Sequence, residues 1–295
     1  MLKSHLYGYP VLMRAGLGNM LIPWARCVLW CKDNNAQMIA PYWTKIRIGP
    51  FVRLERDKRQ YQFLFNHTNQ IAGIKRLIIL ALSRKIDEIN WHSGTVEGRS
   101  DRIVVCFRNM DRADALAGRH KEITEELYRI TKTCYIPKYH ANSPFIGIHV
   151  RLGDFPPASK EELNRGLHCI RIPIQWYADA LLELRKAVGK NMEAKIFSDG
   201  EDDELMPLLK IAGTSRYEGG AAITDLLALS KATVIIASGS SFSIWASYLG
   251  EVPAIWHPGQ QFSMRCNHEE ENRDIEWDRG KVLDNDFIRL IKYPI

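Results

Sequence analysis

The sequence has 295 residues, of which 46 % are hydrophobic, and a formal net charge of +6 at pH 7. This length allows a sizeable core and favours two domains over one. The mild basic excess favours anionic partners such as nucleotides, phosphorylated lipids or membrane surfaces, but it is too weak to argue for nucleic acid. No secretory signal and no uninterrupted apolar run of about 20 residues is visible, so we expect a soluble, cytoplasmic protein.

Six cysteines are spread along the chain, and only Cys27 and Cys31 are close together in sequence. No second close pair completes a zinc site. We therefore expect buried free thiols in a reducing compartment. A disulfide framework is the less favoured alternative.

The first half of the chain opens with a strand, a glycine turn and a helix. The stretch YGYPVLMRAGLGNMLIPWARCVLWCKD places the turn at residues 16–19 and predicts a helix over residues 19–31. DRIVVCFRN, residues 101–109, is predicted to be a strand. A polar, proline-containing stretch at residues 134–145 is the best candidate for a domain boundary.

Residues 71–89, IAGIKRLIILALSRKIDEI, have a helical pattern that is strongly apolar on one side. Basic residues accompany this pattern at Lys75, Arg76, Arg84 and Lys85. A core-facing helix is the favoured interpretation. A helix resting on a bilayer surface is the alternative.

The second half alternates short apolar runs with helical patterns. The expected strands are residues 145–150, 194–199, 233–238 and 252–257, and the expected helices are residues 174–188, 203–213, 223–232 and 241–250. This rhythm indicates right-handed crossovers and a parallel, doubly wound sheet. With the first half, it predicts an α/β chain of two Rossmann-like domains, residues 1–138 and 139–295, facing a cleft.

Polar residues follow each expected strand of the second half, where ligands bind in open α/β sheets. They are His149, Arg151, Gly153 and Asp154 after the first strand, Ser198 and Asp199 after the second, residues 238–241 after the third and His257 after the fourth. His149 and Arg151 are two residues apart, so both point to the same side of a strand. The guanidinium of Arg151 offers a fixed fork of donors that suits phosphate oxygens. An ordinary surface salt bridge is the less favoured interpretation of this arginine.

The stretch ASGSSFSIWA provides a second feature for anion binding. A strand ends there, a Gly/Ser loop follows, and a helix begins near Ser241, so its free N–H groups and dipole favour an anion. An ordinary serine N-cap is the alternative, but a cap needs one serine and this stretch has four. GLGN at residues 16–19 is a weak signal alone, and EDDE at residues 201–204 is typical of helix-dipole compensation rather than of a metal site.

Four stretches together resemble the α-1,2-fucosyltransferases and their wider fucosyltransferase superfamily. HVRLGD is similar to that family's His-x-Arg-x-Gly-Asp motif, and IFSDG and TDLLALSKATVIIASGSSFSIWASYLG are similar to two later segments. GLGNMLIPWARCVLW is similar to the amino-terminal glycine segment. Ala15, Met20, Gly200 and Ile244 depart from the family pattern.

The resemblance implies a GT-B glycosyltransferase that uses a GDP-sugar, usually GDP-fucose, without a metal and with inversion. Its acceptor would be an oligosaccharide or a lipid-linked glycan, in the biosynthesis of a surface polysaccharide such as an O-antigen. Carried over by position, Arg151 would bind the pyrophosphate, and the other donor-binding candidates share contact with the GDP-sugar. They are His149 and Asp225 at the guanosine, Ser240 and Ser241 at the phosphates, Ser198 and Asp199 near the nucleotide, and Gly16, Gly18 and Asn19 at the sugar and acceptor.

The general base is the least defined part of this reading. Inversion normally needs a carboxylate or histidine that takes the acceptor proton. Asp154 is the nearest candidate, and the alternative is that it braces Arg151 or the turn.

Three other functions stay open. They are the same scaffold with another GDP-sugar, a non-catalytic nucleotide- or glycan-binding protein, and a dinucleotide-dependent oxidoreductase. The missing third glycine argues against the oxidoreductase.

Overall fold

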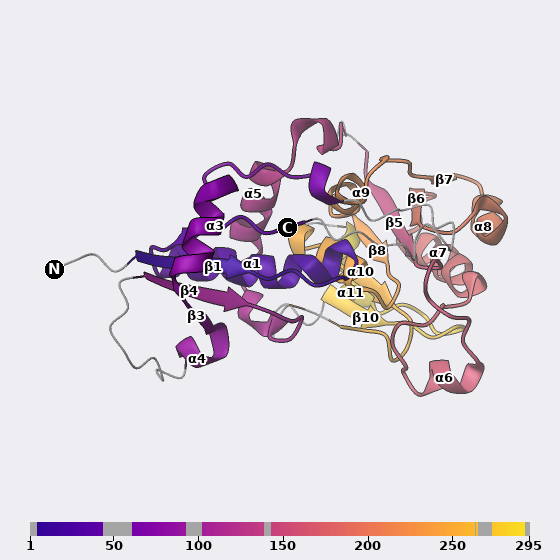
Figure 1. The fold of residues 1–295 in the computed structure, drawn as a ribbon. Helices are drawn as coiled ribbons and strands as arrows, with labels where there is room; N and C mark the ends of the chain where they lie inside the picture. Colours follow the sequence, from indigo (N-terminus) through magenta and orange to yellow (C-terminus); the bar gives the residue numbers. More distant parts are fainter. Residues whose placement is uncertain are drawn as a thin grey trace. The chain divides into compact units, whose positions relative to one another are not determined.

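The computed structural model describes residues 5–43, 61–92, 102–138, 143–262, 264 and 273–292. The described chain separates into two compact units, and the change from unit 1 to unit 2 falls between Cys134 and Tyr135 (Figure 1). Each unit is an α/β layer structure with its own sheet. The prediction of an α/β chain with two mainly parallel sheets is therefore confirmed.

Unit 1 is built on a four-stranded parallel sheet in the order β2-β1-β4-β3. Its strands are β1 (His5–Pro10), β2 (Gln37–Met38), β3 (Arg84–Asp87) and β4 (Arg102–Phe107). Its α-helices are α1 (Leu17–Asp33), α3 (Gly73–Leu82), α4 (Glu88–His92) and α5 (His120–Ile130). Its described residues also form the short 3₁₀ turns η1 (Tyr61–Phe63) and η2 (Ala113–Leu116), and η3 (Thr133–Tyr135) spans the change to unit 2.

Helices α1 and α3 cover opposite faces of this sheet. A Cβ atom added to Gly8 of β1 would lie 2.4 Å from the Cys31 sulfur of α1, so the glycine permits the close approach of that helix. The preceding residue, Tyr7, points to the other face and packs in one cluster with Ile79 of α3. The sheet is therefore enclosed between the two helices.

Residues 71–89 differ from the expected single helix. Helix α3 ends at Leu82, β3 follows after Ser83, and α4 begins at Glu88. The helix ends there because residues 84–87 pair with β4 as the edge strand of the sheet. The expectation of a core-facing helix is confirmed for one side of α3, where Ile79 is buried and Leu80 packs beside it, but other apolar residues of the helix are exposed.

Unit 2 contains a six-stranded parallel sheet in the order β10-β9-β8-β5-β6-β7. Its strands are β5 (Phe145–Val150), β6 (Glu193–Ser198), β7 (Thr214–Arg216), β8 (Val234–Ile236), β9 (Ala254–Trp256) and β10 (Asp274–Glu276). Its helices are α6 (Lys160–Asn164), α7 (Ile174–Val188), α8 (Asp202–Leu209), α9 (Ala222–Leu229), α10 (Ser241–Gly250) and α11 (Asn285–Lys292). The strand order reverses between β5 and β8, which is the switch point where parallel sheets bind ligands.

The core of unit 2 forms where apolar strand residues meet α7. Ile148 and Val150 of β5 pack in one cluster with Leu181 and Leu184 of α7. The buried Arg185 fixes the end of this helix, since its guanidinium donates to the carbonyl oxygens of Met192, Ala212 and Gly213 at 2.7–3.0 Å. This single side chain ties the turns before β6 and β7 to the helix.

The acidic stretch at residues 201–204 performs the role predicted for a helix start. Glu201 is the N-cap of α8, and Glu201 and Glu204 form a reciprocal capping box. Two of these carboxylates also hold arginines, Asp202 with Arg216 at 2.5 Å and Glu204 with Arg171 at 3.0 Å. The stretch therefore stabilises the fold.

The five cysteines in the described ranges are all free thiols. Cys27, Cys31 and Cys106 are buried, as expected, and the sulfurs of Cys27 and Cys31 lie 4.0 Å apart on one face of α1. The expectation of burial is wrong for Cys134 and Cys169, which are exposed. Cys266 lies outside the described residues.

Candidate nucleotide site at the carboxyl end of β5

The residues that follow β5 form a turn held by two carboxylates around one arginine. The Arg151 guanidinium makes an ion pair with Asp199 at 2.6 Å and a hydrogen-bonded ion pair with Asp154. Asp199 is itself fixed, because its second oxygen accepts a hydrogen bond from the Leu152 N–H at 2.8 Å. The two carboxylates hold the guanidinium of Arg151 in place. Its side chain is 22 % exposed, so it is still accessible to a ligand.

Gly153 makes this arrangement possible. A Cβ atom at this position would lie 2.2 Å from the Asp199 carboxylate oxygen that holds Arg151. Gly200 has a similar role, because a Cβ atom there would lie 2.3 Å from Leu152 Cδ1. Both glycines let the turn after β5 lie directly against the end of β6. The departure at Gly200 from the fucosyltransferase pattern therefore has a packing reason.

His149 links β5 to the serine loop (residues 238–243), which follows β8 and includes the first residues of α10. Its Nδ1 lies 2.7 Å from the Ser243 hydroxyl and 2.9 Å from the Ser238 hydroxyl. Its ring stacks on Phe242, with centroids 4.8 Å apart. Burial lowers the pKa of His149 from 6.5 to about 3, so the imidazole is neutral at physiological pH.

The serine loop presents the start of α10 at the switch point. Ser240 is the N-cap, its side chain makes no capping hydrogen bond, and its N–H donates to the Ser238 carbonyl at 2.7 Å. The amides of the first helical turn have no partner within the helix, and the helix dipole adds positive potential there. No acidic residue lies in the first turn of α10. This end of the sheet is therefore suited to an anion.

Two other predicted donor contacts make local hydrogen bonds in the structure. The Ser198 hydroxyl accepts a hydrogen bond from the Gly200 N–H at 3.0 Å. Asp225, in the first turn of α9, accepts one from the Gly219 N–H at 3.0 Å. Ser198 ends the strand next to β5, whereas Asp225 lies on α9. The predicted contacts of Ser198 and Asp225 with a nucleotide stay predictions.

The glycine turn at residues 16–19 belongs to unit 1. Gly16 is the N-cap of α1, and a Cβ atom added to it would meet nothing within 4 Å. The first amide of the helix, that of Leu17, donates to the Tyr61 hydroxyl at 3.2 Å. Gly18 is buried and Asn19 is partly exposed in the first turn. The turn thus lies at the carboxyl end of β1, and its predicted contact with sugar and acceptor stays a prediction.

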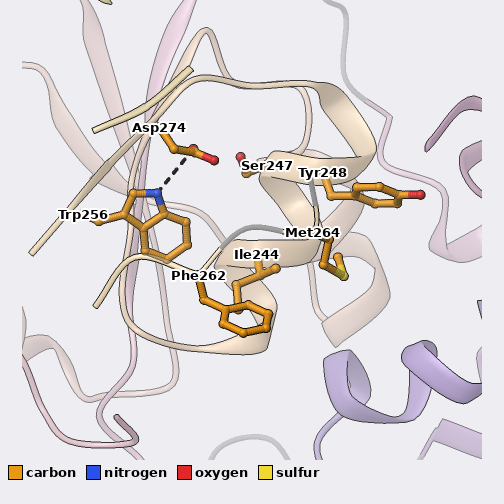
Figure 2. A pocket seen from close by; sticks show the side chains of 7 residues that line it. All are labelled: Ile244, Ser247, Tyr248, Trp256, Phe262, Met264 and Asp274. Atoms are coloured by element: carbon orange, nitrogen blue, oxygen red, sulfur yellow. Dashed lines mark hydrogen bonds between the residues drawn. The ribbon is translucent and has the colours of Figure 1, made fainter. Parts of the chain in front are cut away.

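A shallow hollow lies elsewhere in unit 2, against α10, β9 and β10 (Figure 2). Aromatic and aliphatic side chains line most of it, and its carboxylate, Asp274, accepts a hydrogen bond from the Trp256 indole at 3.3 Å. Ile244, one of the departures from the fucosyltransferase pattern, lines this hollow. None of the predicted site residues does.

The described residues contain no group of three or more His, Cys, Asp or Glu side chains placed to hold a metal ion. Among these residues there is also no helix with the length and hydrophobicity that a bilayer crossing requires.

Sequence reasoning missed Phe242 and Ser243 as parts of the site. Both lie in the first turn of α10 and contact His149 directly. The available signal was the number of serines in the loop, since a single N-cap serine does not explain Ser243 three residues further on. The structure also shows that Asp199, and not Asp154 alone, holds Arg151.

The fold and the site define an α/β protein with an arginine and a helix N-terminus at the switch point of a parallel sheet. The model of glycosyl transferase family 11 matches residues 108–278, which is more than half of the chain. The chain therefore belongs to glycosyl transferase family 11. A search of curated proteins found no match.

Solved structures of two fucosyltransferases are similar at low identity. POFUT1 in complex with GDP-fucose is 12 % identical, with a TM-score of 0.46 and coverage of 86 % of this chain and 98 % of that one. NodZ α-1,6-fucosyltransferase soaked with GDP-fucose is 15 % identical, with a TM-score of 0.45 and coverage of 85 % and 94 %. NodZ from Bradyrhizobium is 14 % identical, with a TM-score of 0.46 and coverage of 85 % and 96 %. At these values the likeness assigns no substrate to this chain.

Proposed function

We propose that this chain transfers fucose from GDP-fucose to a hydroxyl group of a glycan, with an α-1,2 linkage. The observation that carries the proposal is the pair of anion-binding features on neighbouring strands: Arg151 follows β5 and the serine loop follows β8. Family membership supplies the class of reaction. The motif resemblance to α-1,2-fucosyltransferases supports the choice of sugar and linkage.

The proposed reaction is a single displacement at the anomeric carbon of the sugar. The acceptor oxygen forms a bond to this carbon from the face opposite to GDP, so the configuration inverts. The bond from the anomeric carbon to the β-phosphate oxygen breaks, and its electron pair stays on GDP. Arg151 and the first amides of α10 stabilise the charge that develops there, and loss of one such donor costs on the order of 100-fold in rate.

The proposed mechanism is independent of a divalent metal. The fixed guanidinium of Arg151 and the helix N-terminus would replace the cation that neutralises the diphosphate in metal-dependent enzymes. Asp154 is the proposed brace of Arg151, and its second proposed role is to take the acceptor proton. The GDP-sugar is a substrate, and no resident cofactor is part of the proposal.

The proposed acceptor is an oligosaccharide or lipid-linked glycan of a surface polysaccharide such as an O-antigen. We propose that the reaction takes place on the cytoplasmic side of the membrane. The five free thiols within the described ranges are consistent with a reducing compartment.

Calorimetric titration with GDP in the presence of EDTA tests the nucleotide site. We expect the wild type to bind and Arg151→Ala to lose binding. Arg289→Ala is a matched control, because Arg289 of α11 is an exposed arginine paired with Asp286. A wild type that binds no GDP, or an Arg289→Ala variant as defective as Arg151→Ala, would contradict the proposal.

A panel of GDP-sugars then separates the alternatives. Transfer from GDP-fucose in EDTA supports the proposed donor, and transfer from a different GDP-sugar only would assign the scaffold another substrate. GDP binding with neither transfer nor slow hydrolysis of any donor would identify a non-catalytic binding protein.

A further inference from the structure

Helix α3 of unit 1 is apolar on two sides, since Ile79 and Leu80 pack in the core and a second set of apolar residues is exposed. Ile74, Leu77, Ile78 and Leu82 are between 48 % and 76 % exposed. They recur at i, i+3, i+4 and i+8, so they form one continuous stripe along the helix, the exposed apolar stripe of α3. Large exposed apolar stripes of this kind mark interaction surfaces.

The side of α3 that faces the protein combines the apolar Ile79 and Leu80 with one polar group, the Arg76 guanidinium. The Arg76 guanidinium donates to the Ala40 carbonyl at 3.2 Å and stacks on the Tyr42 ring at 3.5 Å. Only Ile79 is fully buried on this side. The inward arginine and the outward apolar residues fix the orientation of the helix, because a rotation about its axis would break the Arg76 contacts. The stripe is therefore presented outward by the fold itself.

Basic residues border the stripe. Lys75 is exposed on the helix beside Ile74, and the exposed Arg84 and Lys85 follow its last turn in the edge strand β3. Helix α3 contains no acidic residue. An apolar stripe with a basic border complements a bilayer surface that has anionic headgroups, since the apolar side chains enter the acyl boundary and the lysines reach the phosphates.

We propose that α3 docks the protein on the surface of an anionic membrane, lying in the plane of the interface. The helix has ten residues, so it is too short to cross a bilayer of about 30 Å. The proposal does not rest on the transfer reaction, because every residue that carries it lies in unit 1, whereas the β5 site belongs to unit 2. A second copy of the chain is the competing occupant of the stripe.

Cosedimentation of the full chain with lipid vesicles tests the proposal. The probes are vesicles of phosphatidylcholine alone and vesicles with about a third phosphatidylglycerol. We expect binding to the anionic vesicles that weakens with added salt, and little binding to the neutral ones. The double variant Leu77→Gln/Ile78→Gln should bind about tenfold more weakly or worse, because glutamine keeps the helix propensity and removes the apolar contact.

Two further sets of variants distinguish specific docking from general stickiness. Lys75→Gln and Lys85→Gln should each weaken binding to the anionic vesicles by about fivefold and leave the neutral vesicles unaffected. Leu182→Gln is the matched control, since Leu182 is an exposed leucine, 52 % accessible, on α7 of unit 2. It should bind as the wild type does. Thermal unfolding by circular dichroism verifies that each variant is folded.

Three results would overturn the proposal. The first is a wild type that does not bind the anionic vesicles. The second is a Leu182→Gln variant that loses as much binding as the Leu77/Ile78 double variant. The third is a wild-type dimer in sedimentation velocity that the double variant dissociates, with no vesicle binding by either form, which would assign the stripe to a second copy.

Discussion

His149 should make the stability of unit 2 fall as the solution becomes acidic. Its imidazole is buried against Phe242 and its Nδ1 contacts the hydroxyls of Ser238 and Ser243. Burial lowers its folded-state pKa to about 3, with a smaller lowering by Arg151 and an opposing effect of Asp199. In the unfolded chain the pKa returns to 6.5, so the unfolded state binds the extra proton.

The magnitude follows from this difference. The free energy of unfolding decreases as the pH falls from 6.5 toward about 3, with a limiting slope of about 1.4 kcal/mol per pH unit from this one group. Between about pH 7 and about pH 5, His149 alone should cost about 2 kcal/mol. A total stability on the order of 10 kcal/mol makes this loss readily measurable.

Urea unfolding at these two pH values, on the wild type and on His149→Asn, isolates the effect. Asparagine keeps a polar group near the two hydroxyls and does not titrate. The variant should therefore lose about 2 kcal/mol less stability on acidification than the wild type does. Any baseline loss from the missing ring appears equally at both pH values. His168→Asn, an exposed imidazole of the same unit, is the control. An acid slope unchanged in His149→Asn would refute the reasoning.

Three further predictions concern the turn after β5 and the end of α7. Gly153→Ala should weaken GDP binding about tenfold in calorimetry, because its Cβ atom displaces Asp199 from Arg151; unchanged affinity would contradict this. Asp154→Asn should tighten GDP binding several-fold, since it removes a negative charge near the diphosphate and keeps a hydrogen bond to Arg151. Its transfer rate distinguishes a brace, with a change within about tenfold, from a general base, with a loss of about 100-fold or more. Arg185→Met should lower the free energy of unfolding by about 3 kcal/mol, because the carbonyl oxygens of three residues lose their hydrogen bonds to the guanidinium; a loss below about 1 kcal/mol in urea unfolding would disagree.

The regular part of unit 2 was predictable because its periodicities are unambiguous. The strand at residues 145–150 and the helices at residues 174–188 and 241–250 match the structure to the residue. Strand β3 escaped prediction because its one apolar residue, Ile86, continues the four-residue spacing of Ile78 and Leu82, and only pairing with β4 separates the strand from α3. Short edge strands contain too few residues for a period to be read.

The residue types at the site were predictable, and their partners were not. The positions of His149 and Arg151 at the end of a buried strand follow from sequence spacing. Which carboxylate holds the arginine depends on how closely two turns approach, and Gly153 and Gly200 set that distance in three dimensions. Likewise, the contact between His149 and Ser243 joins two residues that are 94 positions apart in the sequence.

The charge balance of the site explains why the serine loop is needed. Arg151 shares its single positive charge with two carboxylates, Asp154 and Asp199, so this group of three has no net positive charge to attract a diphosphate. His149 cannot supply one, because its burial keeps it neutral. In the proposed complex, attraction must therefore come from groups that do not titrate. The amides and dipole at the start of α10 have this property, and no acidic residue in its first turn opposes them. In this complex Arg151 orients the diphosphate more than it attracts it, because its guanidinium, held by the two carboxylates, donates hydrogen bonds in fixed directions to the phosphate oxygens.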